Sequence, residues 1–154
     1  METKQEEANL ILRLYEIRRD EEFRKARQWF DTEFSPQSAQ DIIDLLGSGF
    51  SQSAYFRMVT SYWEMVAAFV NYGAIDAGLV HKTNVEHLRF YAKIEPYISE
   101  VRKGFGADFL PELEKLVKSA PNFEEKLAEW RELNKHWTEE NKQSRKAGRG
   151  ESID

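Results

Sequence analysis

The chain has 154 residues, a formal net charge of −5 and no cysteine. The missing cysteines exclude disulfide bonds, cysteine-ligated zinc, iron–sulfur clusters and thiol catalysis, and they fit a cytoplasmic location. The negative charge argues against broad binding to nucleic acids or anionic membranes. One domain is the expected organisation for this length, and the 10 Phe, 6 Tyr and 4 Trp can fill much of its core.

The first segment with helical periodicity covers residues 5–34. Its apolar residues follow one helical phase up to Ile17 and a different helical phase from Phe23 onward. Asp20 is suited to cap a second helix, because its carboxylate can accept hydrogen bonds from the following turn. A single helix with a stutter is the alternative. Ser35-Pro36 ends the segment, and a short helix is expected before Gly47.

A strongly apolar helix is expected over residues 52–72. Its apolar residues recur at i, i+3, i+4 and i+7 and leave only a narrow polar face. A helix with so little polar surface packs among other helices, so we expect it at the centre of the fold. Gly73 is expected to end this helix, and Asp76 to cap a short helix after it.

The remaining segments are also helical. Over residues 84–104, Asn84 is a candidate cap and Pro96 predicts a kink. Helices are expected at 110–118 and 123–141. The sequence therefore predicts an all-α fold, a compact bundle of about five to six helices around the central apolar helix at 52–72.

The predicted domain organisation is one helical-bundle domain over residues 1–141 with a short tail. Residues 142–154 are polar and basic and lack an apolar face, so we expect them to be disordered. No segment is long and apolar enough to predict a membrane span.

Three short motifs follow one another in the middle of the chain. They are Tyr62-Trp63-Glu64, then Gly73-Ala74-Ile75-Asp76, then Pro96-Tyr97-Ile98 with Arg102. The series resembles a family of small bacterial all-helical proteins of unknown function, over residues 50–118. The resemblance implies a helical fold and no particular activity. Many members of that family carry an N-terminal membrane segment; this sequence departs from them, which argues against a membrane-linked role.

Glu64 is the main candidate for a polar or ligand-binding site, together with Tyr62, Trp63 and Arg102. Its apolar neighbours predict partial burial, and a buried carboxylate needs a partner or a raised pKa. Glu64 could bind a ligand or act as a general base. The favoured interpretation is structural, with a bond to Arg102, Arg57 or a tyrosine hydroxyl.

No catalytic, cofactor or metal site is predicted. The Glu-x-x-His motif of di-iron bundles does not occur, and the only histidines are His81, His87 and His136. Arg131 and His136 match the loose Arg-x4–6-His spacing of helical ribonucleases that resemble the HEPN superfamily. The residue after the arginine is glutamate here, where Asn or Asp is usual. An HEPN-like ribonuclease therefore stays as an alternative.

The favoured function is that of a non-enzymatic interaction or regulatory protein. Its partner would be another protein or a second copy of the chain. Trp130 and Trp137 lie one heptad apart. This spacing fits either a helix pair between two copies of the chain or two positions in the core. The tail contains four cationic residues, which are too few to predict strong binding to nucleic acids. A further alternative is a bundle that holds a small apolar ligand near Trp63 and Tyr62.

Overall fold

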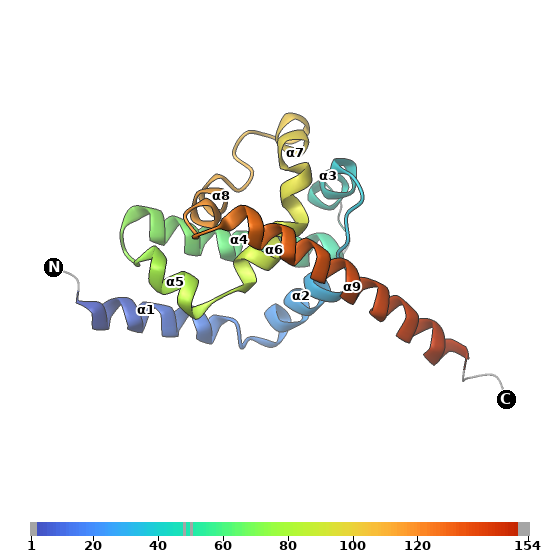
Figure 1. The fold of residues 1–154 in the computed structure, drawn as a ribbon, viewed down its shortest axis with the longest axis horizontal. Coiled ribbons are helices and arrows are strands. Elements are labelled where there is room, and N and C mark those ends of the chain that lie inside the picture. Colours follow the sequence, from blue (N-terminus) through green and yellow to red (C-terminus); the bar gives the residue numbers. More distant parts are fainter. Residues whose placement is uncertain (1–2, 48, 50, 151–154) are drawn as a thin grey trace.

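The computed structural model describes residues 3–47, 49 and 51–150 (Figure 1). This part of the chain forms helices and contains no strand, so the all-α prediction is confirmed. The helices are α1 Lys4–Ile17, α2 Glu21–Thr32, α3 Ala39–Gly47, α4 Ser51–Tyr72, α5 Ala77–Thr83, α6 Glu86–Ile94, the 3-10 helix η1 Glu95–Tyr97, α7 Ile98–Gly104, α8 Pro111–Lys118 and α9 Phe123–Gly150.

Several helix ends follow local capping chemistry. The Asp20 side chain accepts a hydrogen bond from the Phe23 N–H at 3.0 Å, so α1 and α2 are two helices. Gly73, just after α4, has a φ of 98°, a left-handed conformation that favours glycine. Asp76 caps α5 by accepting from the Leu79 N–H at 3.0 Å. These three predictions are confirmed.

Two predictions about the helices are wrong. The described residues contain more helices than five or six, partly because the 3-10 turn at Glu95–Tyr97 divides a segment that was expected as one kinked helix. Asn84 does not cap α6, whose N-cap is Val85, without a side-chain hydrogen bond. Instead, the Asn84 Oδ1 accepts a hydrogen bond from Arg18 Nη1 at 2.9 Å, a partner too distant in sequence for local rules to find.

The core is built mainly on two helices. Helix α4 packs against α2, α3 and α8, while α6 packs against α8 and α9. Aromatic rings join these elements, since Phe30 of α2 lies 5.9 Å from Phe56 of α4 and 4.5 Å from Phe90 of α6, between ring centroids. All three rings are buried, so they connect α2 to both α4 and α6.

Helix α9 runs across the body and then projects away from the other helices (Figure 1). It continues to Gly150, so residues 142–150, which the sequence analysis expected to be disordered, are helical; residues 151–154 lie outside the described part. Lys, Arg, Gln and Ala in this stretch are good helix formers, and Arg145 pairs with Glu33 at 2.5 Å. Within the described residues, we find no helix with the length and apolar character needed to cross a membrane.

Candidate functional site

Glu64 lies on α4 and faces the start of α8. Its Oε1 accepts from the Glu112 N–H at 2.9 Å and its Oε2 accepts from the Leu113 N–H at 2.7 Å. Helix α8 has no side-chain cap of its own, because its N-cap residue is Leu110, with a φ of 54°. Glu64 therefore supplies a carboxylate to the unpaired N–H groups and the positive end of the α8 dipole. Its partners are backbone groups rather than the predicted arginines or tyrosine.

Tyr62 and Trp63 point toward a different part of the molecule. The Tyr62 hydroxyl donates to the Leu14 carbonyl of α1 at 2.8 Å, and burial raises the pKa of Tyr62 to about 12. The Trp63 indole N–H donates to Glu86 Oε1 at 3.3 Å. Both side chains are buried, and both attach α4 to neighbouring helices.

Arg102 belongs to a third location, on α7. Its Nε donates to the Phe109 carbonyl at 3.0 Å, and its Nη1 lies 3.1 Å from Glu114 Oε2. Burial acts to raise the pKa of Glu114, but the charge of Arg102 and the hydrogen bond from Tyr91 lower it below its ordinary value. Arg102 thus fastens the loop before α8. The four predicted site residues are distributed over three structural contacts and do not form one site.

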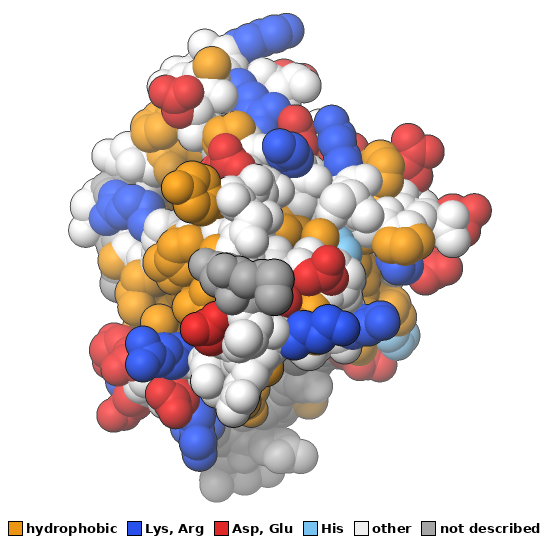
Figure 2. All heavy atoms as spheres, turned by 90° about the vertical axis from the view of Figure 1, so that its left-hand side faces the viewer, with side chains coloured by type: hydrophobic (Ala, Val, Ile, Leu, Met, Phe, Trp, Pro, Cys, Tyr) orange, Lys and Arg blue, Asp and Glu red, His pale blue; other side chains and the backbone are white. Residues whose placement is uncertain are grey.

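An apolar hollow of about 300 Å³ lies between α1, α4 and α5; we call it the α1 groove. Figure 2 views the molecule from the side on which α1 begins and shows hydrophobic side chains gathered between charged ones. Leu12 and Tyr15 line the groove and are 60% and 57% exposed. The groove is lined by Ile11, Leu12, Leu14, Tyr15, Arg18, Tyr62, Trp63, Val66, Val80, Thr83 and Asn84.

Glu86 anchors a charged cluster beside Arg18 and Trp63, two residues that line the α1 groove. Its carboxylate lies 2.9 Å from Arg18 Nη2 and accepts from Arg27 Nε at 2.9 Å, in addition to the Trp63 bond. Only 13% of the Glu86 side chain is exposed. Its hydrogen bond, followed by its charge, raises the pKa of Arg27. Glu86 lies more than 50 positions from either arginine along the chain, so no local sequence pattern indicates these pairs.

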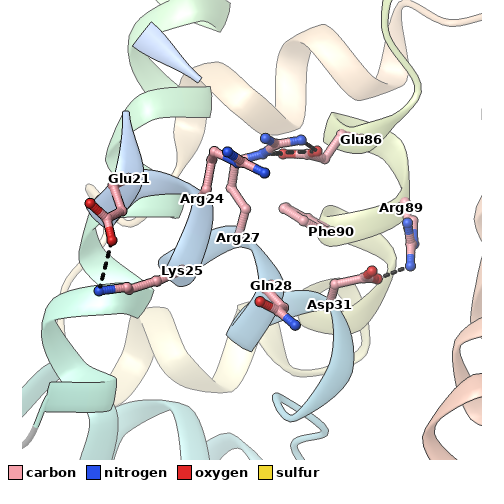
Figure 3. A pocket seen from close by; sticks show the side chains of 9 residues that line it. All are labelled: Glu21, Arg24, Lys25, Arg27, Gln28, Asp31, Glu86, Arg89 and Phe90. Atoms are coloured by element: carbon pink, nitrogen blue, oxygen red, sulfur yellow. Dashed lines mark hydrogen bonds and ion pairs between the residues drawn. The ribbon is translucent and has the colours of Figure 1, made fainter. Parts of the chain in front are cut away.

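A second hollow of about 450 Å³ lies between α2 and α6 and is drawn in Figure 3. Six of its seven charged side chains pair with one another. Arg27 reaches Glu86, Arg89 forms an ion pair with Asp31, and Lys25 lies 3.6 Å from Glu21 (Figure 3). Arg24 lines the same hollow, and among the described residues it forms no ion pair, so one cation is left beside three internal pairs.

Two histidines meet in the core beside Trp63. His81 Nδ1 lies 2.9 Å from His87 Nε2, and His81 Nε2 lies 3.0 Å from Ser119 Oγ. The serine hydroxyl donates to the Leu116 carbonyl at 2.5 Å, so its hydrogen is not directed at His81 and the pair does not resemble an activated nucleophile. Within the described residues, no cluster of three or more His, Cys, Asp or Glu side chains is arranged to bind a metal.

The residues of the ribonuclease alternative do not come together. Arg131 Nη1 donates to Glu95 Oε2 at 2.9 Å, and His136 Nε2 lies 3.1 Å from Glu140 Oε1. Five residues of α-helix turn a side chain by about 140°, so the two side chains leave α9 on different faces.

Trp130 and Trp137 of α9 both contact Arg89 of α6. The Arg89 guanidinium lies 4.4 Å from the Trp137 ring centroid and 5.9 Å from that of Trp130. The two indole rings are 6.4 Å apart. Both tryptophans therefore take part in the contact between α6 and α9 within one chain.

Comparison with known proteins finds one family. The sequence model described as "Domain of unknown function (DUF4760)" matches residues 5–120, from α1 to the end of α8. This range extends well beyond residues 50–118, over which the resemblance was predicted. Neither a curated protein nor a solved structure matches the chain.

Proposed function

The chain belongs to the DUF4760 family, and on that premise we propose that it is a non-enzymatic interaction domain that self-associates through the α1 groove. The observation that carries this proposal is the combination of an apolar hollow with two exposed apolar side chains, Leu12 and Tyr15, on its wall. Contiguous exposed apolar surface is typical of interaction sites.

A second copy of the chain is the partner that fits this surface. A two-fold contact brings the same patch of both subunits together, so the patch must contain both projecting and receiving elements. In the α1 groove, Leu12 and Tyr15 can project, and the hollow of about 300 Å³ beside them can receive. A charged side chain at Leu12 or Tyr15 would remove a projecting apolar group and place a charge beside the hollow.

The test is sedimentation equilibrium over a range of concentrations. The wild-type chain is expected to form dimers, and Leu12→Glu is expected to shift the population to monomers. Leu133→Glu is the matched variant, because Leu133 is also an exposed leucine, 43% accessible, but lies on α9. A monomeric wild type, or dissociation by Leu133→Glu instead of Leu12→Glu, would reject the α1 groove as the contact.

A small apolar ligand in the same groove is a second candidate function. It is favoured by one observation, that Tyr62 and Trp63 line a hollow whose volume is at the lower end of the range for small-molecule pockets. The Trp63 indole should report such a ligand by a change in its fluorescence. This candidate predicts that the dye 8-anilinonaphthalene-1-sulfonate binds saturably to a monomeric form of the chain. The substitution Leu12→Glu should weaken that binding. Binding unaffected by Leu12→Glu would count against it.

We also infer two features of the architecture, the central position of one helix and the extent of the domain. We take α4 as the central helix of the fold, supported by its contacts with α2, α3 and α8. We take residues 1–141 as one domain, supported by the packing of α9 on α6 and α2. A cytoplasmic location is part of the proposal because the sequence contains no cysteine.

A further inference from the structure

The histidine pair of α5 and α6 is part of a chain of hydrogen bonds that leads to α8. His87 is fully buried, and its Nε2 lies 2.9 Å from Nδ1 of His81. Nε2 of His81 lies 3.0 Å from the hydroxyl of Ser119, the residue directly after α8. That hydroxyl lies 2.5 Å from the Leu116 carbonyl oxygen. These four groups therefore connect α5, α6 and α8.

The contact at Leu116 determines where the hydrogens of this chain lie. A carbonyl oxygen can only accept, so Ser119 donates its one hydroxyl hydrogen to Leu116. The Ser119 oxygen then accepts from the Nε2–H of His81, and a neutral His81 keeps a lone pair on Nδ1. This lone pair accepts from the Nε2–H of His87. In the neutral pair, both rings therefore carry their hydrogen on Nε2.

A proton added to this pair leaves a buried donor without an acceptor. Nδ1 of His87 is buried and has no hydrogen-bond partner among the described residues. If His87 takes the proton, this nitrogen becomes an unpaired N–H. If His81 takes the proton, its new Nδ1–H needs the Nε2 lone pair of His87, whose own hydrogen must then move to the same Nδ1. Both routes create an unsatisfied buried N–H group, which proteins rarely tolerate.

The charged groups that face the pair also oppose a proton. Burial, followed by the charge of Lys126 on α9, lowers the pKa of His81, against a smaller rise caused by a backbone carbonyl of α8. Burial, followed by the charges of His81, Arg18 and Lys126, lowers the pKa of His87 to about 3. The carboxylate of Glu86 on α6 is held by two arginines and an indole N–H. Helices α4 and α8 face the pair with uncharged groups, an indole ring and a serine hydroxyl. In the described part of the chain, no carboxylate forms an ion pair with either histidine.

Helix α5 connects the histidine pair to the α1 groove. It has only seven residues, and two of them, Val80 and Thr83, line the groove. His81 lies between these two in the sequence and contacts α6 and the end of α8. Among the described helices, α5 packs only sparsely against each of the others. A short helix with few neighbours is not stable alone, so its position depends on individual side-chain contacts.

We propose that the contact between His81 and His87 is a proton-sensitive switch that controls the α1 groove. In its neutral form the contact holds α5 against α6 and α8, so that Val80 and Thr83 stay in the wall of the groove. A bound proton breaks the contact and releases α5, and the groove loses this wall. The dimer then dissociates, a step that rests on the proposed function; the release of α5 does not.

The signal for this switch is acidification. A released histidine regains its ordinary pKa of 6.5, while the held His87 keeps a pKa of about 3. Between these values the released form binds a proton that the held form does not, so release becomes more favourable as the pH falls below 6.5. One such histidine makes release about tenfold more favourable in acidic buffer, at about pH 5.5, than in neutral buffer, at about pH 7.5.

The first measurement tests the hydrogen positions in the wild-type chain. Side-chain nitrogen NMR of the histidines in neutral buffer distinguishes an N–H group from a lone pair at each ring nitrogen. We expect a hydrogen on Nε2 and a lone pair on Nδ1 in both His81 and His87. A hydrogen on Nδ1 of either ring in neutral buffer would overturn the proposal, because the pair could then accept a proton without an unpaired donor.

The second measurement follows the release of α5 in a chain that cannot use the dimer contact. In Leu12→Glu, the protection of the α5 amides against deuterium exchange, corrected for the intrinsic effect of pH, should fall by about tenfold or more from neutral to acidic buffer. Their exchange should require less free energy than that of the buried α4 amides, which separates release of α5 from unfolding of the whole chain. Equal exchange free energies in the two helices would contradict a separate release.

Variants of the histidines identify the cause of the pH dependence. His81→Gln/His87→Gln replaces both rings with amides that donate and accept but do not titrate, and should remove the pH dependence of α5 exchange. If this variant does not fold, His81→Gln alone should reduce the dependence, because it removes one of two titrating groups. His136→Gln changes an exposed histidine of α9 and should keep the wild-type dependence. The same loss of pH dependence in His136→Gln would overturn the proposal.

Sedimentation equilibrium in the two buffers connects the switch to self-association. The wild-type dimer should dissociate more readily in acidic buffer, and the dimer of the double glutamine variant should be equally stable in both. A dimer that forms while α5 exchange shows no pH dependence would overturn the switch and keep the proposed function. A wild type that is monomeric in both buffers would reject the proposed function, whereas pH-dependent exchange of α5 in that chain would still establish the switch.

Discussion

Glu64 of α4 caps the first turn of α8, with its carboxylate 2.7 Å from the Leu113 backbone nitrogen and 2.9 Å from that of Glu112. One helix thus supplies the cap that another helix lacks. Asn71, two turns further along α4, donates to the Glu112 carbonyl at 3.1 Å. Through these contacts Glu64 and Asn71 connect α4 to the start of α8, which explains why a carboxylate stands in a largely apolar helix.

The first prediction concerns this remote cap. Glu64→Gln removes the charge and one acceptor, so the free energy of unfolding should fall by about 1–3 kcal/mol, the cost of an unsatisfied buried donor. Urea unfolding measures it. Glu132→Gln, which changes an exposed carboxylate on α9, should stay within about 0.5 kcal/mol of the wild type. If both variants lowered the free energy of unfolding equally, Glu64 would not act as the cap of α8.

The second prediction concerns Glu86 and its two arginines. Glu86→Leu leaves Arg18 and Arg27 largely buried without their carboxylate, and should lower the free energy of unfolding by about 3–5 kcal/mol. Replacing the whole cluster, as Arg18→Met/Arg27→Met/Glu86→Leu, should cost less than the single change because no charge is then left unpaired. A triple variant less stable than Glu86→Leu would contradict this account.

The third prediction is a loss of stability in acid, caused by His87. Burial, followed by the charges of His81, Arg18 and Lys126, lowers the pKa of His87 from 6.5 to about 3. Between these two values the unfolded chain binds a proton that the folded chain does not, so stability should fall as the pH decreases from 6.5 toward 3. Above pH 6.5 this contribution is constant. The pKa of His81 is also lowered, chiefly by burial, and acts in the same direction.

Urea unfolding at several pH values measures this effect. His87→Phe removes the titrating group while keeping a ring beside Trp63, so its stability should depend less on pH between 3 and 6.5. His136→Gln removes an exposed histidine on α9 and should keep the wild-type pH dependence. An unchanged slope in His87→Phe would show that other groups cause the acid sensitivity.

The features that the sequence predicted correctly depend on neighbouring residues. The Asp20 and Asp76 caps and the end of α4 at Gly73 each involve groups within a few positions. The 3-10 turn at Glu95–Tyr97 likewise follows from the proline within it. Such determinants act before the chain packs, which is why the pattern of residues reveals them.

The contacts of the candidate site connect distant parts of the chain, so patterns of neighbouring residues cannot reveal them. Glu64 was singled out, but its partners are N–H groups 48 and 49 positions away that no side-chain pattern can indicate. Asn84 was assigned to a local cap, yet its partner is Arg18 on another helix. The α1 groove lies where a small apolar ligand was predicted as an alternative, because Tyr62 and Trp63 line this apolar hollow.

The fourth prediction concerns the attachment of α9 to the body. The Arg89 guanidinium stacks against Trp137 at 4.4 Å and pairs with Asp31 of α2, so one side chain connects three helices. Trp137→Leu keeps an apolar residue but removes the aromatic face, and should lower the free energy of unfolding by about 1–2 kcal/mol. Because α9 projects past this contact, its amides beyond Trp137 should also exchange faster with deuterium. Leu133→Ala, a change at an exposed residue one turn earlier, should leave the exchange of amides beyond Trp137 as in the wild type. Faster exchange in both variants would mean that the contact between Arg89 and Trp137 does not hold the helix.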